Sequence, residues 1–440
     1  MKIGFVAMSG LRVVDAELLR LGLSFPSLQR RAREIEALPS LGLLTLAGMT
    51  PDRFEVEYLE IRDAPSVPTR FDGIALSTLT ATAKEAFVVA DRFRAAGIPV
   101  IIGGLHSTLA AEEAAHHADA VVIGEGECVW AEVLRDLERG ALRKTYDARE
   151  RGPFDLSKSP MPRFDLLTRD RYPRFTVQTQ RGCPYACEFC AASMRLAPGF
   201  RVKPVASVVA EIRRLKELFG DPFIEFADDN TFADKRHGRE LMRAIAGEGI
   251  RWFTETDVSV AEDEELLALM RDAGCRQILI GFESPSIASL DGVELRSNWK
   301  ARRTDRYLRA VEAIQRHGIA VNGCFILGLD GDGPDCFENV FRFVEESGLC
   351  DVQITYLTPF PGTPLWNRLN EEGRLLSATA TERCSLFDIN FQPTRLGIQE
   401  LRDGFRALTA RLYSPEFVRR RTRSFRNHLR TGQRTAALPV

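Results

Sequence analysis

The sequence predicts a two-domain α/β protein in which a doubly wound parallel sheet precedes an open barrel of βα units. Short apolar strands alternate with helical stretches in both halves of the chain, and a proline-containing stretch separates the halves. A length of 440 residues also exceeds the roughly 100 to 200 residues that one ordinary core accommodates, so at least two domains are expected.

The predicted first domain covers residues 1–137 and is Rossmann-like. Its expected strands are KIGFVAM (2–8), FEVEYLEI (54–61), GIALST (73–78), PVIIGG (99–104) and AVVIGEGE (120–127). Three strands run directly into small or glycine-rich turns, namely Ser77-Thr78, Gly103-Gly104 and residues 124–127. Ligands of open α/β sheets bind at the carboxyl ends of the strands, so these turns predict a binding site at that edge.

Residues 138–173 are predicted to be an ordered, extended linker. The stretch is charged at first and then contains Pro153, Pro160, Pro162 and Pro173, which exclude long helices. We therefore place the boundary between the domains near residue 150.

The predicted barrel covers residues 174–374. Its expected strands are FTVQTQRG (175–182), FIEFADD (223–229), WFTETDVS (252–259), QILIGFES (277–284), AVNGCFILG (320–328) and DVQITYLTPF (351–360). Segments between them have helical periodicity, as in 208–219 and 265–274. Six such units form a partial barrel, three quarters of the familiar eight. Residues 375–440 form a C-terminal segment whose arginine-rich end contains Arg419, Arg420, Arg421, Arg423, Arg426, Arg430 and Arg434.

The charge and hydropathy patterns exclude several classes of function. Lys and Arg (59) nearly balance Asp and Glu (61), so no nucleic-acid partner is expected. No run reaches the roughly 18 to 20 apolar residues of a transmembrane helix, so we expect no membrane span and a cytoplasmic protein.

Three of the nine cysteines lie close together in RGCPYACEFC, at Cys183, Cys187 and Cys190. They follow the first barrel strand, and barrel enzymes keep their chemistry at the carboxyl ends of strands. Three thiolates can hold three irons of a cubane cluster and leave the fourth iron open to another ligand. The loop therefore predicts a 4Fe-4S site.

Other interpretations of these cysteines fit less well. A structural zinc site requires a fourth ligand that the surrounding sequence does not supply. A redox dithiol at CEFC has the correct local spacing, but the third cysteine and the barrel context count against it. The six scattered cysteines are interpreted as small buried apolar residues.

The CxxxCxxC spacing after a first barrel strand resembles that of the radical S-adenosylmethionine (SAM) superfamily. The resemblance implies that SAM binds the open iron, and that one electron from a reductant such as flavodoxin or ferredoxin yields a 5′-deoxyadenosyl radical. It also implies a set of SAM-binding positions, which are Phe189, Asp228, Asp229, Glu283, Phe325, Ile326 and Gly328. The carboxylates have an alternative role as caps of the helices that follow them, and EFADDN replaces the family's more usual Gly-Gly-Glu.

The segments 38–49 and 103–127 resemble the domain that precedes the barrel in the cobalamin-binding branch of this superfamily. The resemblance implies cobalamin contacts at the strand ends, namely Ser77, Thr78, Gly103, Gly104, His106, Gly124, Glu125 and Gly126. The glycines would let the backbone approach the corrin closely. The Asp-x-His-x-x-Gly segment of many cobalamin proteins is absent after the first strand, so cobalt would lack that axial histidine, or the domain would bind no cobalamin. His106 is either close to cobalt or a polar turn residue.

The leading functional hypothesis is a cobalamin-dependent radical SAM methyltransferase that methylates an unactivated carbon of a natural-product or lipid-like small molecule. An alternative within the enzyme class is a radical cyclisation, ring contraction or rearrangement, with cobalamin in another role or absent. A sensor of cluster or cobalamin without turnover is the alternative of another class. We expect Arg181, Tyr356, Thr358 and Trp366 to line the substrate site.

Overall fold

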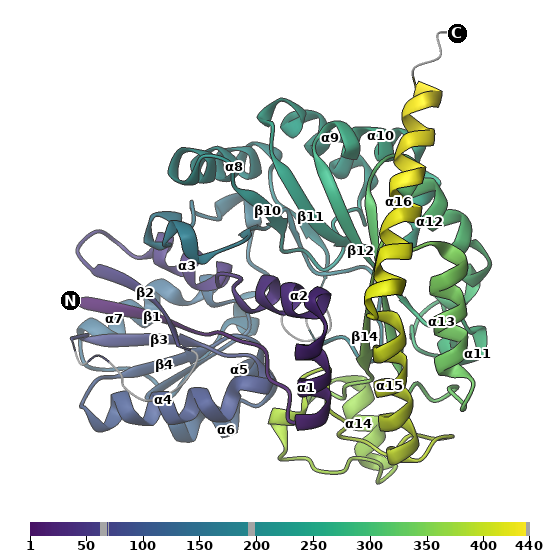
Figure 1. Ribbon diagram of the computed structural model, residues 1–440. Coiled ribbons are helices and arrows are strands. Elements are labelled where there is room, and N and C mark those ends of the chain that lie inside the picture. Colours follow the sequence, from purple (N-terminus) through teal and green to yellow (C-terminus); the bar gives the residue numbers. More distant parts are fainter. Residues whose placement is uncertain (62–67, 69, 192–198, 437–440) are drawn as a thin grey trace.

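A computed structural model describes residues 1–61, 68, 70–191 and 199–436. Two six-stranded parallel sheets organise the chain (Figure 1). Sheet A has the strand order β2-β1-β3-β4-β5-β6, and sheet B has the order β14-β13-β12-β11-β10-β7. The predicted fold class, a Rossmann-like domain followed by a partial barrel, is confirmed.

Sheet A is a doubly wound sheet with helices on both faces. Its strands are β1 (Lys2–Met8), β2 (Glu55–Ile61), β3 (Gly73–Ser77), β4 (Val100–Gly103), β5 (Ala120–Ile123) and β6 (Thr145–Asp147). Helices α3 (Leu41–Met49) and α7 (Trp130–Glu138) pack on one face, where Trp130 contacts Phe5. Helices α4 (Ala83–Ala95), α5 (Leu105–Leu109) and α6 (Ala111–His117) cover the other. Because both faces are covered, the central strands are apolar throughout.

Sheet B is an open, curved sheet whose strands follow one another in sequence order. They are β7 (Phe175–Val177), β10 (Phe223–Phe226), β11 (Arg251–Thr256), β12 (Cys275–Glu283), β13 (Ala320–Leu327) and β14 (Asp351–Tyr356). The helices between them cover the outer face, namely α8 (Val205–Phe219), α9 (Lys235–Ile245), α10 (Glu264–Asp272), α11 (Ile287–Leu290), α12 (Tyr307–Arg316) and α13 (Cys336–Ser347). Strands β7 and β14 are the two edges, so the barrel stays open.

A helical hairpin that the sequence analysis did not identify follows β1. It consists of α1 (Ala16–Ser24) and α2 (Pro26–Glu36). Arg31 of α2 donates to the Gln353 side chain on β14 (3.0 and 2.6 Å), and Arg174 joins Glu34 of α2 (2.7 Å) to Glu225 on β10 (3.0 Å). The hairpin therefore ties the first domain to the inner face of sheet B.

The C-terminal segment is helical and packs on the barrel. It contains α15 (Ile398–Leu412) and α16 (Pro415–Ala436), and α14 (Pro364–Glu371) precedes it at the end of the predicted barrel range. The arginine-rich end forms α16, where Arg421 is buried and donates to the Leu412 carbonyl (3.1 Å) and Arg420 forms an ion pair with Glu345. The side chains of Arg430 and Arg434 lie outside the described part. Among the described helices, none has the length and apolar character needed to cross a membrane.

Two predicted elements differ from the structure. The expected strand 175–182 is divided into β7 and β8 (Gln180–Arg181), and β8 pairs antiparallel with β9 (Arg201–Val202). The reason is Asp228, whose carboxylate accepts the backbone N–H groups of Thr179 (2.8 Å) and Gln180 (3.1 Å) and so diverts this turn from the sheet. Strand β6 lies inside the predicted linker, whose remainder contains short 3-10 turns and no α-helix after α7.

Candidate functional site

The three clustered cysteines lie on one loop after β8, and a second segment holds this loop. The backbone N–H of Cys190 donates to the Cys187 carbonyl (3.1 Å), which tightens the loop between them. Residues 293–295 pair with residues 186–188, since Glu188 N donates to the Val293 carbonyl (2.9 Å) and Leu295 N to the Ala186 carbonyl (3.0 Å). The cysteines are therefore presented by a fixed backbone.

Glu294 fixes this pairing and was not identified from the sequence. Its buried carboxylate accepts the N–H of Ala186 (3.2 Å) and both the N–H and the hydroxyl of Ser297 (2.8 and 2.7 Å). Burial alone would raise the pKa of Glu294, but these hydrogen bonds outweigh it and lower the pKa to about 2. A carboxylate more than 100 residues away from the cysteines gives no local signal that would reveal this contact.

The thiols fit a cubane cluster better than a single ion. All three are free and partly buried, and burial raises the pKa of Cys183 to about 11 and that of Cys187 to about 12. Within the described residues, no group of three or more His, Cys, Asp or Glu side chains could hold a lone metal ion. A cubane is wider than one ion, and three thiolates on one loop suit three of its irons. Asn230 lies beside the loop, with its amide nitrogen 3.9 Å from Cys183 Sγ.

The carboxylates expected to bind SAM differ in their surroundings. Asp228 is buried and accepts from Thr179, Gln180 and Thr231, so its role is to hold the turn before the cysteine loop, and the prediction that it binds SAM is not favoured. Asp229 is exposed and faces the cavity described below. Glu283 has a left-handed backbone (φ 59°) and pairs with Lys300 at 2.7 Å.

The apolar SAM positions also divide. Phe189 is partly buried beside the cysteines. Phe325 packs against Phe282 and Phe343 on the helix-covered side of sheet B, and a Cβ on Gly328 would lie 2.8 Å from the Phe391 ring. These two residues serve the core, whereas Ile326, one position after Phe325, lies on the opposite side of β13.

Charged groups line the inner face of sheet B. Glu255 on β11 remains accessible to solvent, yet protein surrounds it, and burial together with the nearby Glu225 raises its pKa to about 7. Arg31 counteracts this shift. A carboxyl group that titrates near neutral pH therefore lies inside the barrel, and strand alternation gave no sign of it.

A cavity of about 380 Å³ lies where the carboxyl edges of the two sheets meet. Of the predicted cobalamin positions, Ser77, Gly103, Gly104, Gly124, Glu125 and Gly126 line it, and Gln178, Arg181 and Asp229 contribute from the barrel side. Gly104 has φ +98°, and a Cβ there would lie 2.7 Å from Ser77 Oγ. This wall of backbone suits the close approach of a flat ring system.

Two predicted cobalamin contacts lie outside this lining. Thr78 is buried, and its hydroxyl donates to the Leu79 carbonyl (2.9 Å). His106 is fully buried, with its ring 5.7 Å from that of Phe87 and its Nε2 3.2 Å from Glu113. Burial lowers the pKa of His106, although Glu113 opposes the shift. The hypothesis that His106 approaches cobalt is therefore not favoured, and no histidine is among the described residues that line the cavity.

An arginine between the two domains joins the cavity to the cysteine loop. Arg181, two residues before Cys183, pairs with Glu125 (2.6 Å) and Glu127 (2.8 Å), and Arg201 also pairs with Glu125 (2.9 Å). The four charges balance. Arg181 is thus the one of the four predicted substrate residues that lines this cavity, because Tyr356, Thr358 and Trp366 lie elsewhere.

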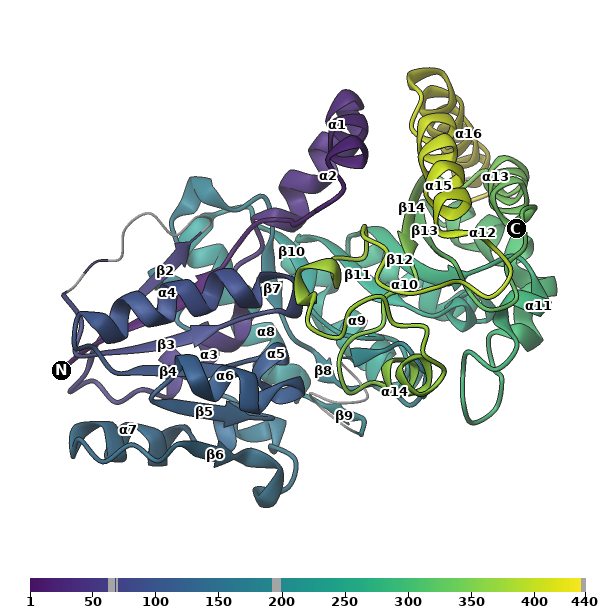
Figure 2. The same cartoon turned by 90° about the horizontal axis from the view of Figure 1, so that it is seen from below.

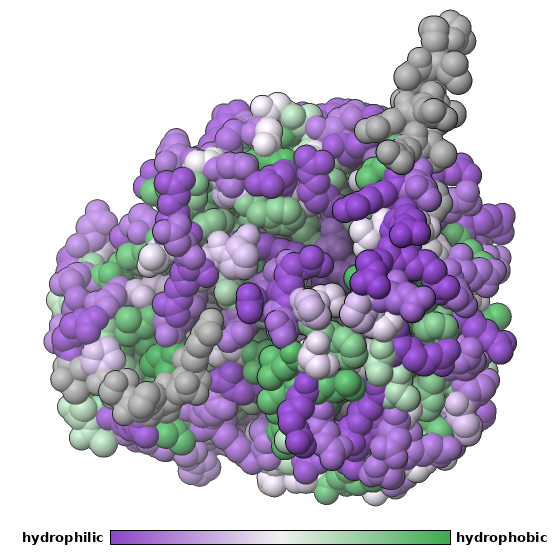
Figure 3. Space-filling view, in the orientation of Figure 1, coloured by the Kyte–Doolittle hydropathy of each residue, from purple (hydrophilic) through white to green (hydrophobic). Residues whose placement is uncertain are grey.

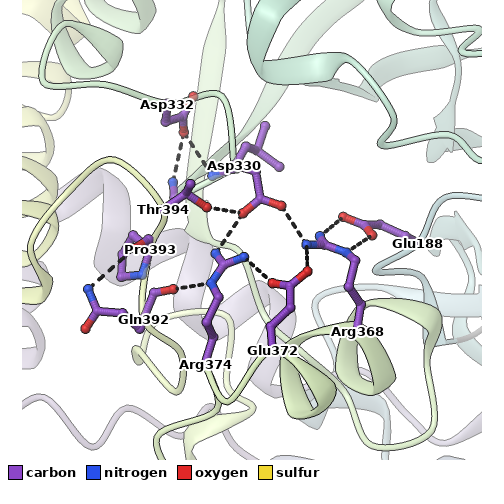
Figure 4. Close-up of polar contacts among 11 residues, drawn as sticks. Glu188, Asp330, Asp332, Arg368, Glu372, Arg374, Gln392, Pro393 and Thr394 are labelled. Atoms are coloured by element: carbon purple, nitrogen blue, oxygen red, sulfur yellow. Dashed lines mark hydrogen bonds and ion pairs between the residues drawn. The ribbon is translucent and has the colours of Figure 1, made fainter.

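Helix α14 and the residues just after it reach the cysteine loop through a network of ion pairs (Figure 4). Arg368 of α14 binds both oxygens of Glu188 (2.8 and 3.1 Å) and also contacts Asp330 (2.8 Å). Arg374 joins Asp330 to Glu372 at 2.7 Å each. Glu188 lies between Cys187 and Cys190, so the position of α14 is coupled to that of the cluster loop.

The family comparisons agree with this geometry. Residues 177–344 match the Radical SAM superfamily, and residues 36–134 match the B12 binding domain. Residues 363–438 match a domain of unknown function, DUF4070.

Individual relatives and solved structures extend the likeness over most of the chain. Bacteriochlorophyllide d C-12(1)-methyltransferase of Chlorobaculum tepidum is 29% identical over 389 residues, which are 87% of this chain and 84% of that protein. The hopanoid C-2 methylase of Rhodopseudomonas palustris is 27% identical, over 77% of this chain and 66% of that protein. The structure of the radical SAM methyltransferase TsrM from Kitasatospora setae, with cobalamin and a [4Fe-4S] cluster bound, has a TM-score of 0.66 at 17% identity and covers 98% of this chain and 99% of that chain. At that identity the likeness shows the fold.

The three-cysteine loop at the mouth of a partial barrel and the family matches define a radical SAM enzyme. More particularly, the chain has the two domains of the cobalamin-binding branch of this superfamily, and the relatives that it resembles over most of its length are methyltransferases. The cofactors of this family are those predicted from the sequence, namely a 4Fe-4S cluster, SAM and cobalamin.

Proposed function

We propose that this chain methylates an unactivated carbon of a small molecule by radical chemistry. When bound, the cluster supplies the electron that cleaves SAM to a 5′-deoxyadenosyl radical, and cobalamin supplies the methyl group. The observation that carries the proposal is the cavity between the two carboxyl edges, whose lining includes Arg181, two residues before Cys183.

The two domains would each hold one of the metal cofactors. Cys183, Cys187 and Cys190 would hold the cluster, and Glu294 keeps their loop in place through its hydrogen bond from Ala186. The glycine turns of sheet A, with Ser77 and Glu125, would hold the corrin. Each domain therefore presents its own cofactor to a shared space.

The polar groups at the strand ends of the barrel would orient SAM. Glu283 is held by Lys300 and ends β12, and Asp229 follows β10 at the cavity. Both lie at carboxyl ends of parallel strands, where a barrel presents groups to its ligands. We favour these two carboxylates over Asp228, because the hydrogen bonds of Asp228 are already committed to the turn.

The substrate proposal rests on the relatives. The relatives compared above are named for methylating bacteriochlorophyllides and hopanoids, and we propose a natural-product or lipid-like small molecule for this chain. We also propose a one-electron reductant such as flavodoxin or ferredoxin as the partner, and a cytoplasmic location.

The test is anaerobic reconstitution with iron, sulfide and hydroxocobalamin, followed by reduction with SAM that carries a CD3 methyl group. We expect 5′-deoxyadenosine by mass spectrometry, bound cobalamin in the visible spectrum, and a mass gain of 17 units in an accepted substrate because CD3 replaces hydrogen. Cys187→Ala should contain little iron and form no deoxyadenosine, whereas Cys350→Ser, far from the loop, should resemble the wild type.

The other outcomes distinguish the alternatives. Deoxyadenosine with a rearranged, unlabelled product would replace methylation by a cyclisation or rearrangement. No deoxyadenosine from a fully loaded protein would favour a sensor. Cleavage of SAM by Cys187→Ala would refute the cluster assignment.

A further inference from the structure

Two adjoining cavities lie between the N-terminal hairpin and the C-terminal segment, away from the cofactor cavity. One measures about 400 Å³ and is polar, and the other measures about 120 Å³ and is apolar. Both have walls from the start of α1, from α15 and from Phe387. Figure 2 shows the hairpin and α15 projecting from the same side of the molecule. Because they share Phe387 and the same two helices, the two cavities are here together called the hairpin groove.

The carboxylates at the polar end are already engaged. Asp15 caps α1 by accepting the N–H groups of Glu17 (3.0 Å) and Leu18 (2.9 Å), and both of its oxygens bind Arg406 at 2.7 Å. Asp388 accepts the backbone N–H groups of Val14 (2.9 Å) and Asp15 (2.8 Å) and the hydroxyl of Ser385 (2.6 Å).

Two guanidinium groups at the same end have no carboxylate within hydrogen-bond distance. Arg402 lies 3.7 Å from Asp15 and donates to Gln399 (2.8 Å). Arg383 donates to the Ile389 carbonyl (3.3 Å) and forms no ion pair within the part of the chain that is described. Arg383, Arg402 and Arg406 balance the charges of Asp15, Glu17 and Asp388 in this lining. Arg383 and Arg402 nevertheless have N–H groups that no carboxylate binds closely, so they can still donate to an added anion.

A buried hydroxyl marks the floor of the polar cavity. Tyr356 is 1% exposed, and its hydroxyl has no hydrogen-bond partner among the described residues. Its ring packs against that of Phe405 of α15, with centroids 4.0 Å apart and ring planes tilted by 30°, which restricts the position of the hydroxyl. A buried donor without a partner costs free energy unless something binds to it, so its presence points to an absent ligand.

The other end of the groove exposes apolar side chains. Leu11, Leu19 and Leu23 line it and are 37%, 44% and 56% exposed. Figure 3 shows hydrophobic residues gathered where α1 lies in Figure 1, with hydrophilic residues on both sides. Contiguous exposed apolar surface with a polar rim is typical of a binding site.

We propose that the hairpin groove binds an amphiphilic small molecule that has one anionic head, a carboxylate or a phosphate, and an apolar body. The head would accept from Arg383, Arg402 and the Tyr356 hydroxyl, and the apolar body would lie on Leu19 and Leu23. The groove extends to Arg31 and Gln353 at the edge of sheet B. Binding there requires no cofactor, so it does not depend on the proposed methylation.

The test is calorimetric titration of the full-length protein with octyl phosphate, octanoate and 1-octanol. We expect saturable binding of one anionic molecule per chain, and comparing octyl phosphate with octanoate identifies the preferred head. Octanol should bind at least about tenfold more weakly, because it lacks the charge-assisted hydrogen bonds. Inorganic phosphate alone should bind more weakly than octyl phosphate, since it lacks the apolar body.

Variants separate the two ends of the groove. Arg402→Gln and Arg383→Gln should each weaken the anionic probes about tenfold and leave octanol unchanged, and Leu19→Gln should weaken all three. Tyr356→Phe should weaken the anionic probes without lowering the melting temperature, because its hydroxyl has no partner to lose. Arg316→Gln, on an exposed face of α12, is the matched control and should bind as the wild type.

The proposal fails if no probe binds saturably, if octanol binds as well as the anions, or if Arg402→Gln and Arg383→Gln both retain wild-type affinity. Each outcome is read on protein whose folding is verified by its melting temperature, so loss of structure is not mistaken for loss of the site.

Discussion

Glu294 shows how one buried carboxylate can maintain a functional loop. It binds the backbone of Ala186 and Ser297, and its pKa is lowered to about 2 from an ordinary value of 4.5. A lowered carboxyl pKa means that its stabilising effect is present above pH 4.5 and is lost as the pH falls toward 2.

We therefore predict that Glu294→Gln destabilises the protein by about 1 to 2 kcal/mol at pH 7, and that the difference shrinks on acidification below pH 4.5. Iron retention should fall with it, because the cysteine loop loses a fixed partner. Denaturant midpoints across pH, together with iron content, measure both. Glu312→Gln, on exposed α12, should change neither, and a pH-independent loss in Glu294→Gln would contradict the electrostatic explanation.

Glu255 is expected to show the opposite pH dependence. Its pKa is raised to about 7, so its neutral form is favoured in the fold, and its contribution to stability is present below pH 4.5 and lost as the pH rises through 7. Glu255→Gln, which stays neutral, should become more stable than the wild type between pH 5 and pH 8. The gain should be on the order of 1 kcal/mol, because solvent reaches the side chain and screens the charge. Equal stability of the two proteins at pH 8 would show that the carboxyl titrates normally.

Sequence alone identified the residues whose chemistry is local. The three cysteines lie within one short segment, and the glycines of Gly103-Gly104 and residues 124–126 follow directly from strands, so their pattern carries the signal. Glu294, Asn230 and Lys300 act on partners far along the chain, and no spacing rule reaches them. His106 and Phe325 are buried and do not line the cavity, and their predicted roles stay predictions, because a position next to a motif does not show which way the side chain points.

At the scale of elements, the alternation of apolar strands with helical stretches, and the glycine and proline residues between them, predicted the parallel strands of both sheets, apart from β6. The regular alternation failed where a side chain competes for the backbone, since Asp228 accepts N–H groups that the predicted strand 175–182 would otherwise give to the sheet. Strand β6 has three residues, too few for a periodic signal. The hairpin α1–α2 was not predicted from the sequence.

Helix α14 is expected to influence the cluster through Arg368. Burial raises the pKa of Glu188 and Arg368 opposes the shift, so removing the arginine leaves a buried carboxylate without its main partner. We predict that Arg368→Met destabilises the cysteine loop by about 2 kcal/mol and accelerates loss of iron in air. The control is Arg342→Met, which removes an exposed ion pair with Glu338 on α13. It should lower the free energy of unfolding by less than about 1 kcal/mol. Equal rates of iron loss in the two variants would show that α14 does not influence the cluster.

At the scale of the whole molecule, the enzyme depends on how the two sheets meet. Arg181 and Arg201 neutralise Glu125 and Glu127 at this junction, where both glutamate side chains are 8% exposed. A buried charge that loses its partner costs about 3 to 5 kcal/mol, far more than an exposed ion pair contributes. Arg181→Met should therefore lower the denaturant midpoint strongly and release cobalamin, because Glu125 and Glu127 lie in the wall of the cavity that we propose for cobalamin. Adding Glu127→Gln restores neutrality and should recover much of both losses.

Arg143→Met, which removes a half-exposed pair with Glu132, should leave cobalamin retention intact. The double variant could instead retain no more cobalamin than Arg181→Met alone. In that case the shape of the Arg181 side chain, and not the charge balance, holds the two domains around the cofactor.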